Sequence, residues 1–140
     1  MKTLYTAEAL STGAARNGHV ATSDGQLVAD LRIPVEMGGA GGGLNPELLF
    51  AAGYSACFHS ALQSVARTRK VELHDTSVGA RVSIGPNDNG GFQLAVALEV
   101  TIPDLPHDEA QELADAAHQV CPYSNATRGN IDVTVTVAED

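Results

Sequence analysis

The sequence has little positive charge, few aromatic residues and only two cysteines. Eight Lys and Arg residues stand against 17 Asp and Glu, so the formal net charge of the 140-residue chain is −9. A field of this sign repels polyanions, and no basic run offsets it locally, so we expect neither nucleic acid nor a membrane as a partner. Tryptophan is absent and aromatic residues make up 4% of the chain. A core must therefore be built from Ala, Val, Leu and Ile.

Long hydrophobic runs are also missing. The stretch 48–66 carries no formal charge, but it includes His59, Gln63 and several serines, which a membrane-spanning helix normally lacks. The first ten residues, MKTLYTAEAL, contain no apolar run of signal-peptide length, so we expect a cytoplasmic protein. In that compartment a pair of cysteines is more often catalytic, redox-active or metal-binding than structural.

Length and composition favour one folded domain over 1–140. Alternating apolar and polar residues predict strands over 27–37, 78–84, 92–102 and 131–137, and a weaker alternation favours another over 3–10. Pro34 lacks an amide donor, so the first of these strands is expected at a sheet edge or with a bulge. The segment PNDNGG (86–91) predicts a hairpin loop between two of the strands.

Two helices are predicted between these strands. The first runs over about 45–69, with Asn45 as N-cap, Pro46 at the first helical position and Glu47 in the first turn. The second is marked by an apolar stripe over 110–121 and is bounded by Pro122. Because the strands at 78–102 form a hairpin with no helix between them, the order of elements predicts an α+β fold with antiparallel sheet.

A glycine tract, GGAGGG (38–43), lies between a predicted strand and the first helix. It lacks the Lys-Ser/Thr of a phosphate loop and the three-glycine spacing of a dinucleotide site. We interpret it as a close-packed turn that lets the backbone approach a site near the start of the helix.

Cys57 lies in the middle of the first helix, in the apolar segment NPELLFAAGYSACFHSAL (45–62), and has three interpretations. It packs as a small buried hydrophobe, it binds metal, or it performs thiol chemistry. The segments CFH (57–59) and HQVC (118–121) offer two Cys and two His, but helical residues two apart point about 200° away from each other. Cys57 and His59 therefore do not ligate one ion on an unbroken helix, and we expect His59 and His118 to be hydrogen-bonded or partly exposed.

Thiol chemistry needs a thiolate, a nearby cation to stabilise it and a second thiol for recycling. A free thiol has a pKa near ~8.5 and is mostly protonated at neutral pH, so a guanidinium is needed. Arg16 precedes an Asn-Gly turn, whereas Arg128 lies in a polar turn. Glu47 is the sole formal charge between Glu36 and Arg67; it either favours the helix dipole or holds an arginine through two hydrogen bonds.

Distance complicates a site that contains both Glu47 and Cys57. Ten helical residues separate them by about 15 Å along the axis. If both serve one site, either Glu47 or Arg16 comes from a second subunit, or the helix is interrupted near Gly53.

Four segments together resemble the organic hydroperoxide resistance proteins of the OsmC/Ohr family. They are NPELLFAAGYSACF around the first cysteine, VCPYSNATRGNIDV around the second, GGAGGGLNPE before the helix, and the Arg-Asn-Gly turn. The resemblance implies intertwined homodimers in which antiparallel sheets wrap around central helices. It also implies a cysteine peroxidase that reduces organic hydroperoxides, including fatty-acid hydroperoxides, to alcohols.

By position, the resemblance makes Cys57 the peroxidatic cysteine, Cys121 the resolving cysteine, and Arg16 with Glu47 the pair that polarises the site. It implies dihydrolipoamide or a lipoylated protein as the reductant, with no bound cofactor and no metal. Apolar residues expected near Cys57 either bind the organic part of the substrate or pack in the core; they are Met37, Phe50 and Phe58. Two alternatives remain: the osmotically inducible OsmC branch, with a broader peroxide preference, and a non-enzymatic redox-sensing dimer.

Overall fold

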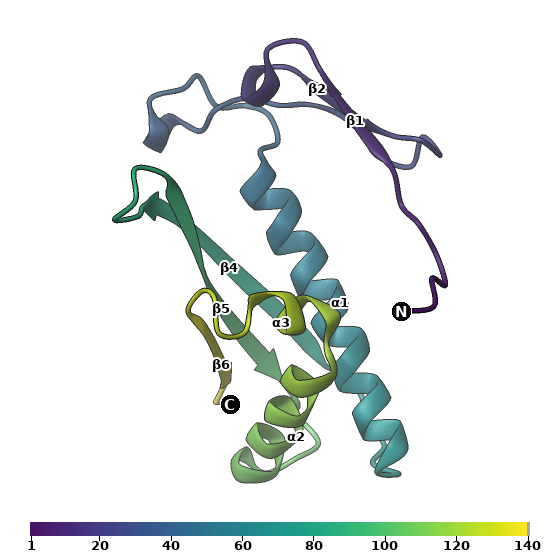
Figure 1. The fold of residues 1–140 in the computed structure, drawn as a ribbon. Helices are drawn as coiled ribbons and strands as arrows, with labels where there is room; N and C mark the ends of the chain where they lie inside the picture. Colours follow the sequence, from purple (N-terminus) through teal and green to yellow (C-terminus); the bar gives the residue numbers. More distant parts are fainter. Residues whose placement is uncertain (140) are drawn as a thin grey trace. The chain divides into compact units, whose positions relative to one another are not determined.

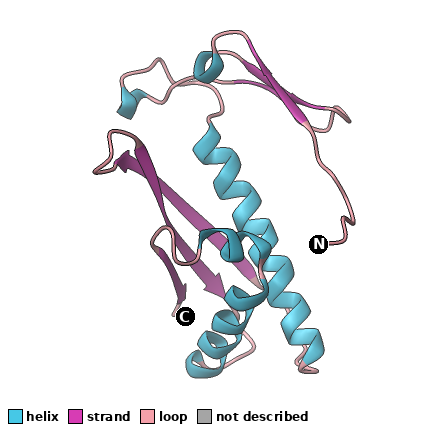
Figure 2. Cartoon of the chain, in the orientation of Figure 1, coloured by secondary structure: helices cyan, strands magenta, loops and turns pink. Residues whose placement is uncertain are grey.

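The chain folds as two compact units, Met1–Leu49 and a second that begins at Phe50, in a computed structural model that describes residues 1–139 (Figures 1 and 2). The expectation of one domain over 1–140 stays a prediction, and its last residue, Asp140, lies outside the described part. Within residues 1–139, no helix combines the length and the apolar character needed to cross a bilayer.

The first unit contains a three-stranded antiparallel sheet in the order β1-β2-β3. Its strands are β1 (Ala9–Thr12), β2 (His19–Thr22) and β3 (Val28–Asp30), and the 3-10 turn η1 (Ala15–Asn17) joins the first two. The strand expected over 3–10 thus begins six residues later, and β2 was not predicted. It is four residues long, too short for alternation to give a clear signal.

The prediction of one strand over 27–37 was wrong in its second half. β3 ends at Asp30, after which Leu31 forms an isolated parallel bridge with Leu44 and Val35–Met37 forms a second 3-10 turn, η2. Pro34 precedes this turn with φ −64° and ψ 154°, and its carbonyl accepts the amide of Met37 at 3.0 Å. The apolar alternation continues past Pro34, but the backbone hydrogen bonds there close a turn instead of a ladder.

Helix α1 (Pro46–Thr68) begins where the sequence predicts. The Leu48 amide donates to Asn45 Oδ1 at 2.8 Å, as expected of an N-cap, and Pro46 is the first helical residue. The helix continues without a break through Gly53 to Thr68. The suggested interruption near Gly53 was therefore wrong.

The second unit contains a three-stranded sheet in the order β4-β5-β6. β4 (Ser77–Pro86) and β5 (Phe92–Thr101) form the predicted antiparallel hairpin, whereas β6 (Val133–Val137) pairs parallel to β5. The α+β class is confirmed, but the expected antiparallel pairing does not extend to β6. α2 (His107–Val120) and α3 (Pro122–Thr127) form the crossover between β5 and β6 that a parallel pair needs. α3 was not predicted: Pro122 ends one helix and begins the next.

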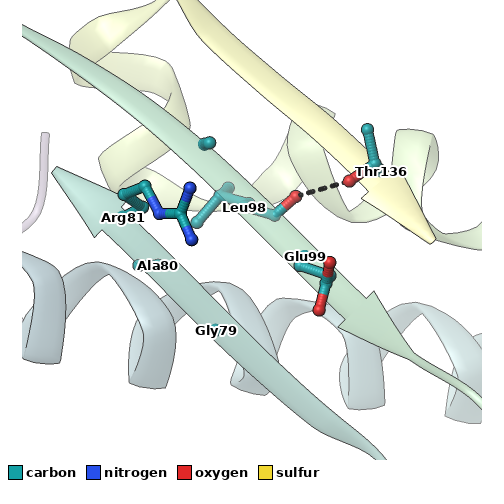
Figure 3. A pocket seen from close by; sticks show the side chains of 7 residues that line it. Gly79, Ala80, Arg81, Leu98, Glu99 and Thr136 are labelled. Atoms are coloured by element: carbon teal, nitrogen blue, oxygen red, sulfur yellow. Dashed lines mark hydrogen bonds between the residues drawn. The ribbon is translucent and has the colours of Figure 1, made fainter. Parts of the chain in front are cut away.

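The core lies between one face of this sheet and the helices. Each β5 residue at an even position from Val96 to Val100 is at most 3% exposed, and these side chains pack with Phe58 and Leu62 of α1 and with the alanines of α2. The opposite face is polar. Figure 3 shows Arg81, Glu99 and Thr136 on that face with the helices behind the sheet, around a hollow left by small residues such as Gly79 and Ala97.

Truncating a side chain to alanine should change the free energy of unfolding by different amounts on the two faces of the sheet. We expect Leu98→Ala, at a position 1% exposed, to lower the free energy of unfolding by about 2–5 kcal/mol because it leaves a cavity in the core. Arg81→Ala on the polar face is the control and should change this quantity by no more than about 0.5 kcal/mol. Denaturant titration measures both, and equal losses would contradict the assignment of the faces.

Candidate functional site

The two cysteines, 64 positions apart in the sequence, lie side by side in the second unit. Their Sγ atoms are 3.7 Å apart, and both are free thiols. Cys57 is partly exposed in the middle of α1, whereas Cys121 is fully buried. A disulfide requires a sulfur separation of about 2.05 Å, so a small local movement is enough to join them.

The position of Cys121 follows from the proline after it. Cys121 is the one residue between α2 and α3, and its backbone is extended, with φ −65° and ψ 125°. A residue before proline avoids the helical conformation, which ends α2, while Pro122 suits the first position of the next helix. The corner thus places a cysteine where two helices meet α1.

The surroundings of Cys57 disfavour its thiolate. Burial raises the pKa of the Cys57 thiol above its ordinary value, the neighbouring Cys121 adds to this rise, and the backbone N–H of Tyr123 opposes it. None of the described groups that shift this pKa is a cation. A reactive thiolate at this position therefore needs additional positive charge.

An aromatic cluster, which the sequence analysis missed, joins α3 to α1 beside the cysteines. The ring centroids of Phe50, Tyr54 and Tyr123 are 5.6–5.9 Å from one another. A Cβ atom on Gly53 would lie 3.0 Å from the Tyr123 hydroxyl, so the glycine gives this ring its room on the helix. The spacing of Phe50 and Tyr54 by one helical turn was the available signal.

Arg16 and Glu47 form a bidentate ion pair within the first unit. Arg16 Nη1 donates to Glu47 Oε2 at 2.9 Å, and Nη2 donates to Oε1 at 2.8 Å. The Glu47 side chain is only 14% exposed, whereas that of Arg16 is 38% exposed. The carboxylate thus holds the guanidinium in one orientation and leaves part of it accessible. This is the arrangement that the sequence analysis considered for Glu47.

The turn that carries Arg16 is fixed by its backbone. Ala15 has φ +53°, and a Cβ atom on Gly18 would lie 2.2 Å from the carbonyl oxygen of Thr12, so this close approach requires glycine. The Asn17 side chain accepts the amide of Ile33 at 3.1 Å. The Arg-Asn-Gly turn is therefore a structural requirement for the position of Arg16.

The ion pair shifts the pKa of both partners. The hydrogen bonds that Glu47 accepts from Arg16 lower the pKa of Glu47, and the same contact raises the pKa of Arg16. Because the pKa of Glu47 is lower in the folded than in the unfolded state, the pair stabilises the fold at pH values above the unfolded-state pKa of glutamate. This contribution is lost as the pH falls through the folded-state pKa. At neutral pH the pair is intact.

The remaining predicted residues lie in different environments. Met37 is 43% exposed in η2, Phe50 is half-buried in the aromatic cluster, and Phe58 is fully buried in the core. His59 Nε2 lies 2.8 Å from Thr76 Oγ1, and His118 Nδ1 lies 2.7 Å from Ser124 Oγ, so both are hydrogen-bonded as expected. In the described chain, no three His, Cys, Asp or Glu side chains converge on a possible metal position.

The comparisons with known proteins agree on one family. The family model described as OsmC-like protein matches residues 39–136. An organic hydroperoxide resistance protein of Xanthomonas axonopodis pv. citri (strain 306) is 53% identical, over 98% of this chain and 96% of that protein.

Two crystal structures of organic hydroperoxide resistance proteins are also similar to this chain. The one from Elizabethkingia anophelis matches with a TM-score of 0.95 and 54% identity, over 100% of both chains. The one from Legionella pneumophila matches with a TM-score of 0.94 and 51% identity, over 99% of this chain and 100% of that chain. The similarity therefore extends over the entire fold, including both cysteine segments.

The ion pair predicts a pH-dependent difference in stability. We expect wild type to exceed Glu47→Gln by about 1 kcal/mol in free energy of unfolding near neutral pH, and the difference to shrink below the ordinary glutamate pKa of about 4.3. Denaturant titrations at several pH values measure it. Glu36→Gln removes the same charge at an exposed position and serves as control; the same pH-dependent difference there would contradict a specific contribution of the pair.

Proposed function

Because this chain belongs to the organic hydroperoxide resistance group of the OsmC/Ohr family, we propose that it is a thiol-dependent peroxidase that reduces organic hydroperoxides, including fatty-acid hydroperoxides, to alcohols. The observation that carries this proposal is the contact of two free thiols at 3.7 Å, one partly exposed and the other fully buried. The exposed sulfur can meet a substrate, and the buried one can meet only its neighbour.

Reaction begins at Cys57. Its thiolate attacks the outer oxygen of R–OOH, the O–O bond breaks, and the inner oxygen leaves with the electron pair and takes a proton to become the alcohol. The sulfur is oxidised by two electrons to a sulfenic acid.

Cys121 completes the oxidative half of the cycle. Its thiolate attacks the Cys57 sulfur, the S–O bond breaks, and the hydroxide takes a proton and leaves as water. A dihydrolipoyl group, free or on a lipoylated protein, then reopens the disulfide by two thiol exchanges and becomes the cyclic disulfide itself. The two electrons that reduced the peroxide thus come from the dithiol, and no metal or bound cofactor takes part.

Arg16 supplies the positive charge that Cys57 needs. Burial raises the pKa of the Cys57 thiol, so a guanidinium near the sulfur would favour the thiolate and then stabilise negative charge on the leaving oxygen. Glu47 fixes the orientation of that guanidinium through two hydrogen bonds. Since α1 is continuous, Glu47 and Cys57 of one chain lie about 15 Å apart along its axis. We place the Arg16–Glu47 pair of one protomer at Cys57 of its partner in a homodimer.

The organic group of the substrate would contact apolar side chains. Phe50 extends the apolar surface of α1 near Cys57, and Met37 offers an exposed thioether. Phe58 is fully buried, which supports the core-packing role that the sequence analysis offered for it. In a reducing compartment a pair of cysteines is more often catalytic or redox-active than structural. We therefore propose that the protein is cytoplasmic.

Serine variants separate the roles of the two cysteines. Cys57→Ser should abolish peroxide consumption with dihydrolipoamide, whereas Cys121→Ser should consume about one equivalent of cumene hydroperoxide and then stall, because its sulfenic acid has no resolving partner. Stopped-flow kinetics with mass spectrometry of Cys57 measures both. Steady-state turnover by Cys57→Ser would refute the proposal. Stoichiometric oxidation of wild type without turnover would favour the redox sensor. A faster reaction with hydrogen peroxide than with cumene hydroperoxide would favour the OsmC branch.

Mixed dimers test whether the arginine acts across the subunit boundary. Arg16→Ala should raise the pKa of Cys57 and slow its alkylation at neutral pH by about tenfold or more. Co-expressing this chain with a Cys57→Ser chain leaves one Cys57 in the mixed dimer, which only the Arg16 of the other chain can serve. Restored alkylation in the purified mixed dimer is the expected result. Alkylation as slow as in the Arg16→Ala homodimer would place the arginine in the same chain as its cysteine.

A further inference from the structure

A buried chain of polar side chains connects the three helices that carry the cysteines. Tyr54 Oη on α1 lies 2.9 Å from Ser124 Oγ and 3.1 Å from Thr127 Oγ1 on α3. Ser124 Oγ in turn lies 2.7 Å from Nδ1 of His118 on α2. Tyr54 and Ser124 are 0% exposed and Thr127 is 6% exposed. Such groups are rarely buried together unless each is hydrogen-bonded, and here each has a partner.

The protonation state of His118 sets the direction of its hydrogen bond to Ser124. Burial and the charge of Arg128 lower the pKa of His118, which favours the neutral imidazole. A neutral ring with its proton on Nε2 accepts at Nδ1 from the Ser124 hydroxyl. Thr127 Oγ1 donates to the Ser124 carbonyl at 3.3 Å, which leaves its lone pairs to accept from the Tyr54 hydroxyl. The orientation of α3 relative to α1 and α2 is thus specified by directional bonds as well as by packing.

The network runs parallel to the cysteine pair, one helical turn away. Tyr54 precedes Cys57 by three residues on α1, while His118 and Ser124 lie three residues before and after Cys121. On α1, residues three apart share a face, so Tyr54 and Cys57 lie on the same side of the helix. The contact between α1 and the α2–α3 corner therefore includes the two sulfurs, this set of hydrogen bonds and the aromatic cluster. Arg128 Nη2 also donates to the His118 carbonyl at 2.7 Å, which ties the end of α3 to α2.

We propose that the Tyr54–Ser124–His118 network is a positioning device that holds the Cys121 corner against α1, so that the Cys121 sulfur reaches Cys57 before a second oxidant does. The residues act through the backbone of the corner, and no direct contact with a reacting sulfur is required of them. In this role they set the rate of disulfide closure, whereas the first attack on Cys57 is independent of them. The consequence for peroxide chemistry rests on the proposed function; the closure step itself does not.

An aromatic disulfide, dithiobis-nitrobenzoate, isolates the closure step without any peroxide. The partly exposed Cys57 thiolate attacks the reagent and releases one nitrothiobenzoate anion, leaving a mixed disulfide on Cys57. The Cys121 thiolate then attacks the Cys57 sulfur and expels the second anion. The two releases are followed by absorbance in the full-length protein.

Tyr54→Phe keeps the buried ring and removes only its hydroxyl. We expect the second release to slow by about tenfold, the effect of losing one buried hydrogen bond, while the first keeps its rate. Ser124→Ala should have the same effect, and Thr127→Val, at the end of the network, a smaller one. Tyr5→Phe removes a hydroxyl from a tyrosine 78% exposed and is the matched control. Far-ultraviolet circular dichroism establishes that each variant is folded.

Peroxide titration gives a second measurement that general destabilisation would not reproduce. Slower closure leaves the Cys57 sulfenic acid exposed, so Tyr54→Phe should form more sulfinic acid per equivalent of cumene hydroperoxide than wild type. In a Cys121→Ser background, where no closure occurs, Tyr54→Phe should make no difference. A persistent difference there would mean that Tyr54 acts on Cys57, and would overturn the inference.

The two proposals fail in different ways. Closure at the wild-type rate in both Tyr54→Phe and Ser124→Ala would overturn the positioning role, even if the protein turns over hydroperoxide. Absence of peroxidase turnover in wild type, together with slowed closure in the variants, would overturn the proposed function and leave the positioning role intact.

Discussion

The Cys121–Pro122 bond determines where the second thiol lies. Proline excludes the helical conformation at Cys121 and starts a new helix at Pro122, so the chain turns at the cysteine and the turn packs on α1. The same corner lies within the crossover that joins β5 to the parallel strand β6. The sulfur contact thus depends on one restricted backbone position.

Two opposing effects govern the chemistry of Cys57. Its partly buried, apolar setting disfavours the thiolate, and under the proposed function the same setting suits an organic substrate. Arg16, the cation that we propose for this role, is held by the Glu47 carboxylate in the first unit, and the turn that carries it requires glycine at position 18. Cys57 and Arg16 lie in different units, and each is fixed by its own local structure.

Much of the fold could be read from short-range patterns. The β4–β5 hairpin and the start of α1 at Asn45 and Pro46 were predicted correctly, because alternation and capping are local properties of the chain. The end of β3 was not, since side-chain alternation persists past Pro34 while the backbone bonds do not. α3 and the parallel pairing of β6 were missed because six residues carry little periodic signal and strand direction depends on the crossover.

The sequence by itself determined the elements of the candidate site: two thiols, a scarce arginine, an isolated glutamate and a proline that fixes one corner. Those choices are local, set by residue chemistry and backbone restriction. Only the tertiary structure decided which of them meet, because the Cys57–Cys121 contact and the Arg16–Glu47 pair join positions 64 and 31 residues apart. It also revealed the buried hydroxyls of Tyr54 and Ser124, which look unremarkable in sequence because their hydrogen-bond partners come from other helices.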